Sequence, residues 1–226
     1  MAVLSLLFLY GKISVEGIMQ KNSYPGKFIV FEGLDGSGQS TQAALLRDFL
    51  IKNGQEVVLT KEPTKDSLAG QKIREVLNKN TEVSPMYLQG LFAEDRKEHL
   101  DKVIVPALKN GMIVISDRYF FSSFAFGSSP GVSLDELIKL NQDFLMPDLT
   151  MILRVRPEVC IERIGKRGEP QTLFEETEKL KKVWRTYAIL PERFENVSII
   201  DGEKSIQEVF EEIKRVIKTY GLAGKI

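Results

Sequence analysis

The chain has 226 residues, in which 31 Lys and Arg residues balance 31 Asp and Glu residues, so its formal net charge is zero. This balance excludes a protein-wide basic surface for nucleic acid or an anionic membrane, and any anion must be bound by a local cluster of cations. A single cysteine and a single histidine exclude intramolecular disulfides and metal sites built from several Cys or His residues. We therefore expect one cytoplasmic domain without a nucleic-acid or membrane partner.

The first 26 residues are expected to be a poorly ordered extension in front of a domain at residues 27–226. Their apolar run, AVLSLLFLY, is too short to span a bilayer. No basic segment precedes the run, so it is a weak candidate for a signal peptide, an alternative that the residues leave open. We expect the functional chain to begin at Met19.

Along the chain, apolar β-branched segments alternate with longer helical patterns, which predicts an α/β three-layer sandwich with a five-stranded parallel sheet. Strands are expected at residues 27–32, 56–60, 112–116, 149–154 and 197–201. Helices are expected at residues 39–53, 67–79, 84–109 with a break near Pro106, 133–143, 157–166, 174–195 and 205–220. Within these helices, His99 is predicted to be solvated among charged neighbours, and Cys160 to be a small buried residue.

The first expected strand runs into GLDGSGQST, residues 33–41, which fits the phosphate-binding pattern G-x-x-x-x-G-K-[ST] except that Gln39 stands in place of lysine. Glycines let backbone amides approach phosphate oxygens, and the helix that follows directs its positive dipole end at them. Without the lysine charge, transition-state stabilisation falls by about 1–2 kcal/mol, roughly ten- to thirtyfold in rate, so other cations must compensate. The candidate phosphate-binding residues are Gly33, Gly36, Ser37, Gly38, Gln39, Ser40 and Thr41.

Five segments, FEGLDGSGQSTQ, LTKEP, LFAEDRKEH, VIVPALKNG and ISDRYFFSSFAF, together resemble the thymidylate (dTMP) kinases over about residues 27–217. The resemblance implies a P-loop nucleoside-monophosphate kinase fold with a short lid, at about residues 163–174. It also implies phosphorylation of dTMP to dTDP for dTTP synthesis, with ATP as donor and Mg²⁺ as cofactor, by an enzyme that is commonly a homodimer. Two alternatives stay open: a nucleotide-binding protein impaired by Gln39, and a related deoxynucleoside kinase.

The same resemblance assigns residues to the dTMP site. It implies that Asp35 accepts a hydrogen bond from the sugar 3′-hydroxyl, that Phe92 stacks on thymine, and that Arg96 donates to a base carbonyl. Arg118 is expected to clamp the dTMP phosphate through its planar fork, and Phe126 to crowd the sugar 2′ position. The other residues expected near dTMP are Lys61, Arg74, Ser122 and Ser123.

The remaining assignments concern the metal and the transition state. The residues expected to hold Mg²⁺, directly or through water, are Ser40, Glu62 and Asp117. Asp117 is also expected to orient Arg118 during catalysis. Since the phosphate loop contains no arginine, the resemblance implies that a lid arginine, Arg167 or Arg163, stabilises the transferring phosphoryl group.

Overall fold

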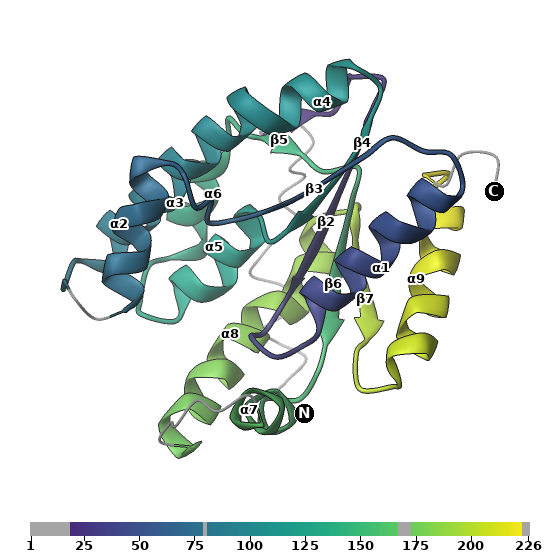
Figure 1. The fold of residues 1–226 in the computed structure, drawn as a ribbon. Coiled ribbons are helices and arrows are strands. Elements are labelled where there is room, and N and C mark those ends of the chain that lie inside the picture. Colours follow the sequence, from purple (N-terminus) through teal and green to yellow (C-terminus); the bar gives the residue numbers. More distant parts are fainter. Residues whose placement is uncertain (1–18, 79–80, 167–172, 223–226) are drawn as a thin grey trace.

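A computed structural model of the chain describes residues 19–78, 81–166 and 173–222 (Figure 1). Its five-stranded sheet is parallel throughout, in the order β3–β4–β2–β6–β7. The strands are β2 (Lys27–Gly33), β3 (Val57–Lys61), β4 (Ile113–Asp117), β6 (Leu149–Arg154) and β7 (Val197–Asp201). All five predicted strands and the predicted fold class are therefore confirmed.

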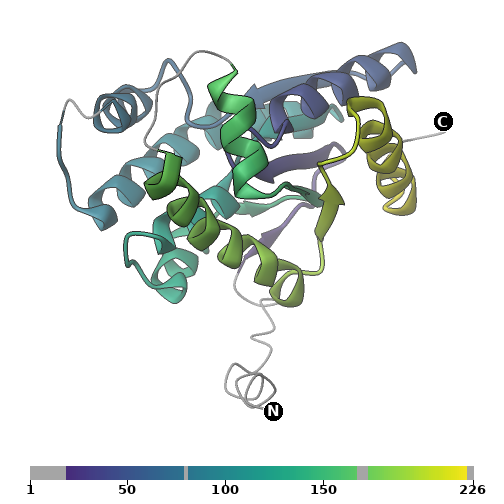
Figure 2. The same ribbon diagram turned by 90° about the horizontal axis from the view of Figure 1, so that it is seen from below.

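Helices cover both faces of the sheet (Figures 1 and 2). Successive side chains of β2 point to opposite faces, so Ile29 and Phe31 pack with α1 and α9, whereas Phe28 and Val30 pack with helices of the other layer. The first layer consists of α1 (Gln39–Lys52) and α9 (Ile206–Thr219). The other helices are α2 (Leu68–Leu77), α3 (Pro85–His99), η2 (Leu100–Ile104), α4 (Val105–Lys109), α5 (Phe120–Ser128), α6 (Leu134–Asn141), α7 (Pro157–Gly165) and α8 (Leu173–Arg193).

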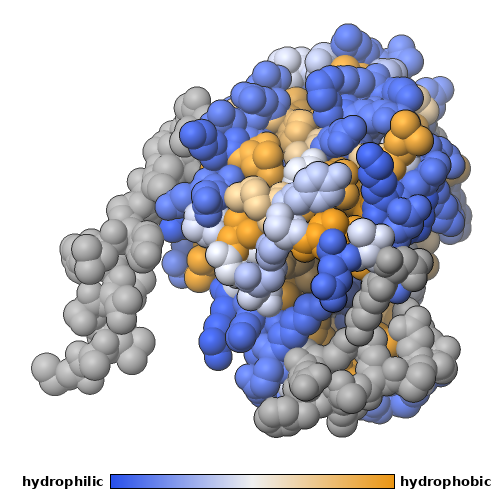
Figure 3. Space-filling model, turned by 90° about the vertical axis from the view of Figure 1, so that its left-hand side faces the viewer, coloured by the Kyte–Doolittle hydropathy of each residue, from blue (hydrophilic) through white to orange (hydrophobic). Residues whose placement is uncertain are grey.

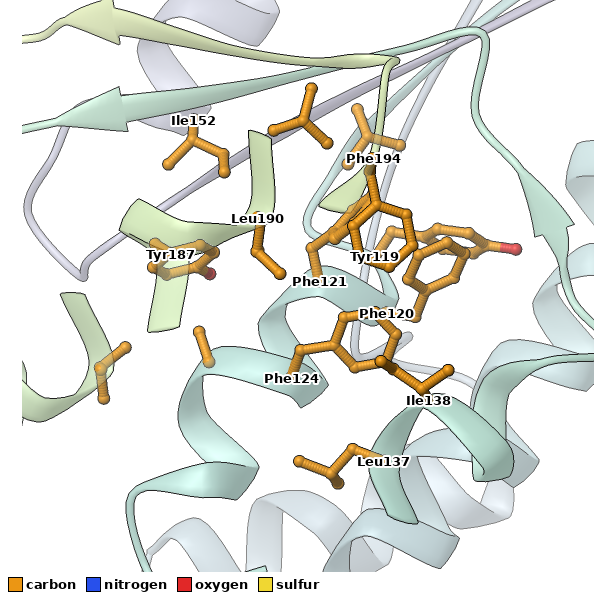
Figure 4. Packing of buried hydrophobic residues seen from close by; sticks show 14 of the residues in the cluster. Tyr119, Phe120, Phe121, Phe124, Leu137, Ile138, Ile152, Tyr187, Leu190 and Phe194 are labelled. Atoms are coloured by element: carbon orange, nitrogen blue, oxygen red, sulfur yellow. The ribbon is translucent and has the colours of Figure 1, made fainter. Parts of the chain in front are cut away.

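Helix α5 was not predicted from the sequence, and its start has an unusual cause. Its N-cap residue, Tyr119, makes no side-chain capping hydrogen bond. Instead the carboxylate of Glu32, at the end of β2, accepts from the backbone N–H groups of Tyr119 and Ser122 over 2.9 and 3.0 Å. A carboxylate at a helix N-terminus satisfies free N–H groups and complements the helix dipole. The aromatic side chains of α5 then pack against α6 and α8 (Figure 4).

The segment before β2 belongs to the fold from residue 19 onward. Strand β1 (Gln20–Lys21) pairs in parallel with β5 (Leu145–Met146). Asn22 Nδ2 donates to Asp148 Oδ2 over 2.6 Å, and the N–H of Gly26 donates to the carbonyl oxygen of Leu108 over 2.9 Å. Residues 19–26 were expected in a poorly ordered extension, but these contacts tie them to the domain; residues 1–18 lie outside the described part.

The predicted break near Pro106 is a change of helix type. Residues 85–109 form one helical rod in which α3 passes through the π-helical turn η2 into α4. The wider turn is closed by the N–H of Val105 donating to the carbonyl oxygen of Leu100, five residues earlier. In the described ranges, no helix has the length and apolar character needed to cross a membrane.

Candidate active site

The carboxyl ends of β2, β3 and β4 bring the predicted phosphate-binding and catalytic residues to one edge of the sheet. In the register of these strands, Asp117 lies beside Phe31 of β2 and beside Lys61 of β3. Strand β2 ends at Gly33, and α1 begins at Gln39 after a short loop. These motifs therefore meet at the carboxyl edge of a parallel sheet, where such folds bind their ligands.

The loop between β2 and α1 has a backbone that suits glycine. Gly36 and Gly38 have φ angles of +84° and +96°. A Cβ atom on Gly36 would lie 2.6 Å from the carbonyl oxygen of Cys160 on α7, so this position also lacks room for a side chain. The loop leads into a 14-residue helix whose free N–H groups and positive dipole end favour phosphate oxygens.

Gln39, in the position of the usual lysine, is buried at the first turn of α1. Its side chain is only 6% exposed, and its Oε1 atom has no hydrogen-bond partner. An amide can donate a hydrogen bond to phosphate, but it carries no charge. The loop therefore supplies backbone amides and a helix dipole without its own cation.

A hydroxyl, a carboxylate and an ammonium group meet beside this loop. Ser40 Oγ donates to Asp117 Oδ2 over 2.5 Å, and Lys61 Nζ donates to the same oxygen over 2.7 Å. The second oxygen, Asp117 Oδ1, is buried without a partner. Hydroxyl and carboxylate oxygens suit Mg²⁺, which needs few protein ligands when phosphates supply the rest, so Ser40 and Asp117 fit the implied metal. Among the described residues no group of three acidic, His or Cys side chains forms a fuller metal cage.

Arg118 follows Asp117 and is the only non-glycine residue of the described ranges with a positive φ, +76°. Its Nη1 donates to the carbonyl oxygen of Gly33 and to Ser122 Oγ, both over 3.0 Å, and its Nη2 donates to Asp35 Oδ1 over 2.8 Å. Burial alone would lower the pKa of Arg118, but Asp35 and other nearby acidic groups raise it above its ordinary value. A strained backbone that fixes a charged fork beside the phosphate loop is typical of a functional residue.

Glu32 lies beneath Arg118 and was not identified from the sequence. It is fully buried, and its Oε2 accepts from Ser122 Oγ over 2.5 Å and from the Tyr187 hydroxyl of α8 over 2.8 Å. Burial raises the pKa of Glu32, although Arg118 and the hydrogen bonds to the carboxylate oppose this shift. The carboxylate thus joins β2, the start of α5 and helix α8 around the arginine.

A cavity of about 640 Å³ opens beside the phosphate loop. On the face of the molecule that carries α2, apolar side chains gather between hydrophilic ones (Figure 3). The structure brings eight of the nine residues expected around dTMP into the wall of this cavity: Asp35, Lys61, Phe92, Arg96, Arg118, Ser122, Ser123 and Phe126. Residues of the wall that were not predicted include Pro63, Leu88, Gln89, Tyr119, Pro130 and Lys179.

Arg96 lines the cavity although it is only 1% exposed. Its Nε donates to Glu62 Oε2 over 2.9 Å, with Nη2 at 2.8 Å from the same oxygen. Its Nη1 donates to Asn141 Oδ1 over 2.6 Å, and its Nη2 to Ser123 Oγ over 3.4 Å. These contacts use at most four of the five guanidinium N–H donors, so at least one N–H is not engaged by them.

His99 is buried, and the prediction that it is solvated is wrong. It is 3% exposed; its Nδ1 lies 3.1 Å from Glu62 Oε1, and its Nε2 lies 2.6 Å from Thr60 Oγ1. Both carboxylate oxygens of Glu62 are therefore bound, one by Arg96 and one by His99. This arrangement supports a positioning role for Glu62 and gives no support to its expected role near Mg²⁺.

Gln89 and Phe92 lie on the same face of α3 as Arg96, because residues three and four apart are neighbours on a helix. Phe92 is half-buried in the cavity wall. Gln89 is 4% exposed, and its Oε1 has no partner. A Cβ atom on Gly127 of α5 would lie 2.9 Å from Gln89 Cδ, so the glycine leaves room for this amide. The unpaired Oε1 of Gln89 marks the residue as a candidate ligand contact, and only the structure reveals this feature.

Arg74 is the one residue expected around dTMP that does not line the cavity. Its Nη1 donates to the carbonyl oxygen of Thr64 over 2.7 Å and its Nη2 to that of Lys65 over 2.5 Å. Asp95 holds the same segment, since it accepts from the N–H of Thr64 over 2.9 Å and from Ser67 Oγ. In this structure Arg74 therefore stabilises the loop between β3 and α2.

Of the predicted lid cations, Arg163 lies next to the phosphate loop. Its Nη1 donates to the carbonyl oxygen of Ser37 over 3.4 Å, and its Nη2 to that of Gly202 over 3.2 Å. Lys166 forms an ion pair with Glu162, one helical turn away. Arg167 and the rest of the lid segment 167–172 lie outside the described residues.

Comparison with known proteins gives one consistent result. The family model described as thymidylate kinase matches residues 31–213. A probable thymidylate kinase of Pyrococcus abyssi is 39% identical over 198 residues, which cover 85% of this chain and 96% of that protein. A probable thymidylate kinase of Thermococcus onnurineus is 40% identical over 199 residues, or 84% and 97% of the two chains. The thymidylate kinase of Caldicellulosiruptor saccharolyticus is 37% identical over 205 residues, or 85% and 96%.

Proposed function

Because the chain belongs to the thymidylate kinase family, we propose that it transfers the terminal phosphoryl group of ATP to dTMP, forming dTDP for dTTP synthesis. The observation that carries this proposal is the junction of the phosphate loop with the cavity. Asp35, Lys61 and Arg118 line the cavity and also belong to, or contact, the loop and its first helical turn. An acceptor phosphate at this junction would lie next to the terminal phosphate of ATP.

In the acceptor site, thymine would lie against Phe92, with the free N–H of Arg96 directed at a ring carbonyl. Offset stacking on an aromatic ring and a charge-assisted hydrogen bond are suited to holding a planar base with carbonyl groups. Asp35 would accept from the sugar 3′-hydroxyl. Phe126, whose ring centroid is 5.1 Å from Arg118 Cζ, would leave little space at the sugar 2′ position.

In the donor site, the amides of the glycine loop and the N-terminus of α1 would bind the phosphates of ATP. We assign Mg²⁺ to Ser40 and Asp117, where it would neutralise charge on the donor phosphates. The acceptor attacks through its own phosphate oxygen, so no side-chain nucleophile is needed. Arg118 would hold that phosphate in line, and Arg163 or Arg167 would stabilise the charge that develops during transfer.

We further propose that the enzyme is a cytoplasmic homodimer, as is common in the family. Analytical ultracentrifugation of the full chain tests the dimer directly. A single species with the mass of one chain, 25.6 kDa, at micromolar concentration would contradict it.

A coupled assay for ADP release tests the proposed function, with dTMP, dUMP, thymidine and a no-acceptor control run in parallel. We expect release that depends on dTMP and is slower with thymidine. A preference for thymidine would identify a deoxynucleoside kinase. Binding of an ATP analogue without turnover on any acceptor would identify an impaired nucleotide-binding protein. The variant Arg118→Met should abolish dTMP-dependent release while the affinity for the ATP analogue is retained, because the residue is assigned to the acceptor phosphate.

A further inference from the structure

The phosphate loop lacks a cation of its own, and this raises the question of which group supplies the charge. At position 39 the buried glutamine offers only an uncharged amide. The transition state of phosphoryl transfer gathers negative charge on the transferring group, and placed cations are the main means of stabilising it. A compensating cation must reach both the first turn of α1 and the cavity.

Three of the four basic residues described near the loop are held by other groups. Arg118 is occupied by Asp35, Ser122 and the carbonyl oxygen of Gly33. Arg163 is turned onto two backbone carbonyl oxygens, so it would have to leave them to meet the transferring group, as would Arg118 its own partners. Lys166 has only an exposed ion pair with Glu162, but it does not line the cavity.

Lys61 reaches both the first turn of α1 and the cavity. Its Nζ lies 2.7 Å from Asp117 Oδ2 and 3.5 Å from Ser40 Oγ, at the first turn of α1. The same residue lines the acceptor cavity. It comes from the end of β3, paired in register with Asp117 of β4, so the backbone beneath it is fixed by the sheet.

The ion pair of Lys61 with Asp117 does not lock the side chain in place. The side chain of Lys61 is 56% exposed, although that of Asp117 is only 6% exposed, so water reaches the ammonium group and competes with the carboxylate for it. Its ammonium group is a compact charge with three donors on a flexible stem. Rotation about the bonds of this stem can exchange a carboxylate oxygen for a phosphate oxygen while the group stays at the junction.

We propose that Lys61 is a catalytic residue that supplies, from strand β3, the positive charge that Gln39 does not provide from the phosphate loop. The proposal rests on the proposed function. It assigns Lys61 to the transferring phosphoryl group, in contact with donor and acceptor, in addition to its expected place beside dTMP.

Kinetics of four variants test this assignment: Lys61→Met, Lys61→Arg, Gln39→Lys and the double variant Lys61→Met/Gln39→Lys. In Lys61→Met we expect kcat to fall roughly ten- to thirtyfold, as for a charge-assisted hydrogen bond lost in the transition state, with KM for dTMP changed less than about threefold. Lys61→Arg should keep most of the rate. Gln39→Lys should rescue Lys61→Met more than it accelerates the unmodified enzyme, because two cations acting on one group are not additive.

A binding measurement separates this proposal from the proposed function, because it needs no turnover. Calorimetry with ADP, Mg²⁺, dTMP and aluminium fluoride, which mimics the transferring phosphoryl group, should show at least about tenfold weaker binding for Lys61→Met, with binding of ADP alone unchanged. Lys52→Met is the matched control, at the far end of α1 about 20 Å from the loop, and should change neither quantity. Unchanged kcat and mimic binding in Lys61→Met would overturn the proposal, and so would a loss confined to KM for dTMP. If the unmodified enzyme failed to turn over dTMP, the proposed function would fail, and the mimic would still decide whether Lys61 meets the transferring group.

Discussion

Replacing Arg96 with alanine should weaken both the fold and the acceptor site, and the buried ion pair sets the size of the first effect. The guanidinium and its partner Glu62 are 1% and 3% exposed. Removing one partner of a buried pair leaves an uncompensated charge and costs about 3–5 kcal/mol. For a chain of this size, about 2–4 °C of Tm is lost per kcal/mol, so we expect Tm to fall by roughly 6–20 °C.

The assay combines differential scanning calorimetry with kinetics at a temperature at least 15 °C below the measured Tm of the variant. Here we expect a raised KM for dTMP with little change for ATP, because Arg96 lines only the acceptor cavity. Adding Glu62→Gln to Arg96→Ala removes the orphaned charge and should recover part of the lost Tm without restoring KM.

The control is Arg185→Ala, which removes an exposed arginine of α8. Its free energy of unfolding should change by less than about 0.5 kcal/mol. If Arg96→Ala lowered Tm no more than this control, the ion pair would not stabilise the fold as described. If KM rose equally for dTMP and ATP, the assignment of Arg96 to the base would be wrong.

Three further results are expected. Burial raises the pKa of Glu32, so its protonated form contributes to stability fully below the ordinary pKa of 4.5, and this contribution is lost as pH rises through the folded-state pKa. The unfolding free energy of the unmodified chain should therefore fall relative to that of Glu32→Gln as pH rises. A difference that does not depend on pH would contradict this. Gly36→Ala should be about 1–3 kcal/mol less stable than Gly38→Ala in urea titrations, because both have positive φ but only the first meets a backbone atom; equal losses would argue against the steric reason. Burial raises the pKa of Cys160 to about 12, so iodoacetamide at pH 8 should label it only after unfolding, and labelling of the folded chain would contradict that environment.

The strands and the phosphate loop could be predicted because their signals are local. A run of β-branched residues, or glycines at fixed spacing before a helix, needs no distant partner to be recognised. The left-handed glycines after α1 and α4 also carry a local signal, an Asn-Gly pair at the end of each helix, and Gly54 and Gly111 both have φ of +79°. The N-terminus of α9 is equally local, since Ser205 and Glu208 form a full capping box.

The remaining features depend on residues far apart in the chain. The start of helix α5 is capped by the carboxylate of Glu32, 87 residues before Tyr119, so the residues near Phe120 carry no local signal for it. His99 stands among charged residues in the sequence, and this pattern predicted a solvated side chain. In the structure it is buried because both ring nitrogens contact polar groups at the end of β3, Glu62 and Thr60. The resemblance predicted that Arg96 contacts the base. Its buried ion pair with Glu62, 34 residues earlier, could not be predicted from the sequence.

The π-helical turn at Leu100–Ile104 sets the orientation of the cavity-lining face of α3 relative to the core. Ahead of the turn, the rod presents Gln89, Phe92 and Arg96 to the cavity; beyond it, Leu108 of α4 is buried in the core. A π turn holds one residue more than an α turn, and each residue of a helix turns the chain by about 100°. Deleting a single residue between 100 and 104 would thus leave both ends helical but rotate Gln89, Phe92 and Arg96 out of the cavity. Helix register alone, with these side chains unchanged, would then remove the contacts proposed for the base.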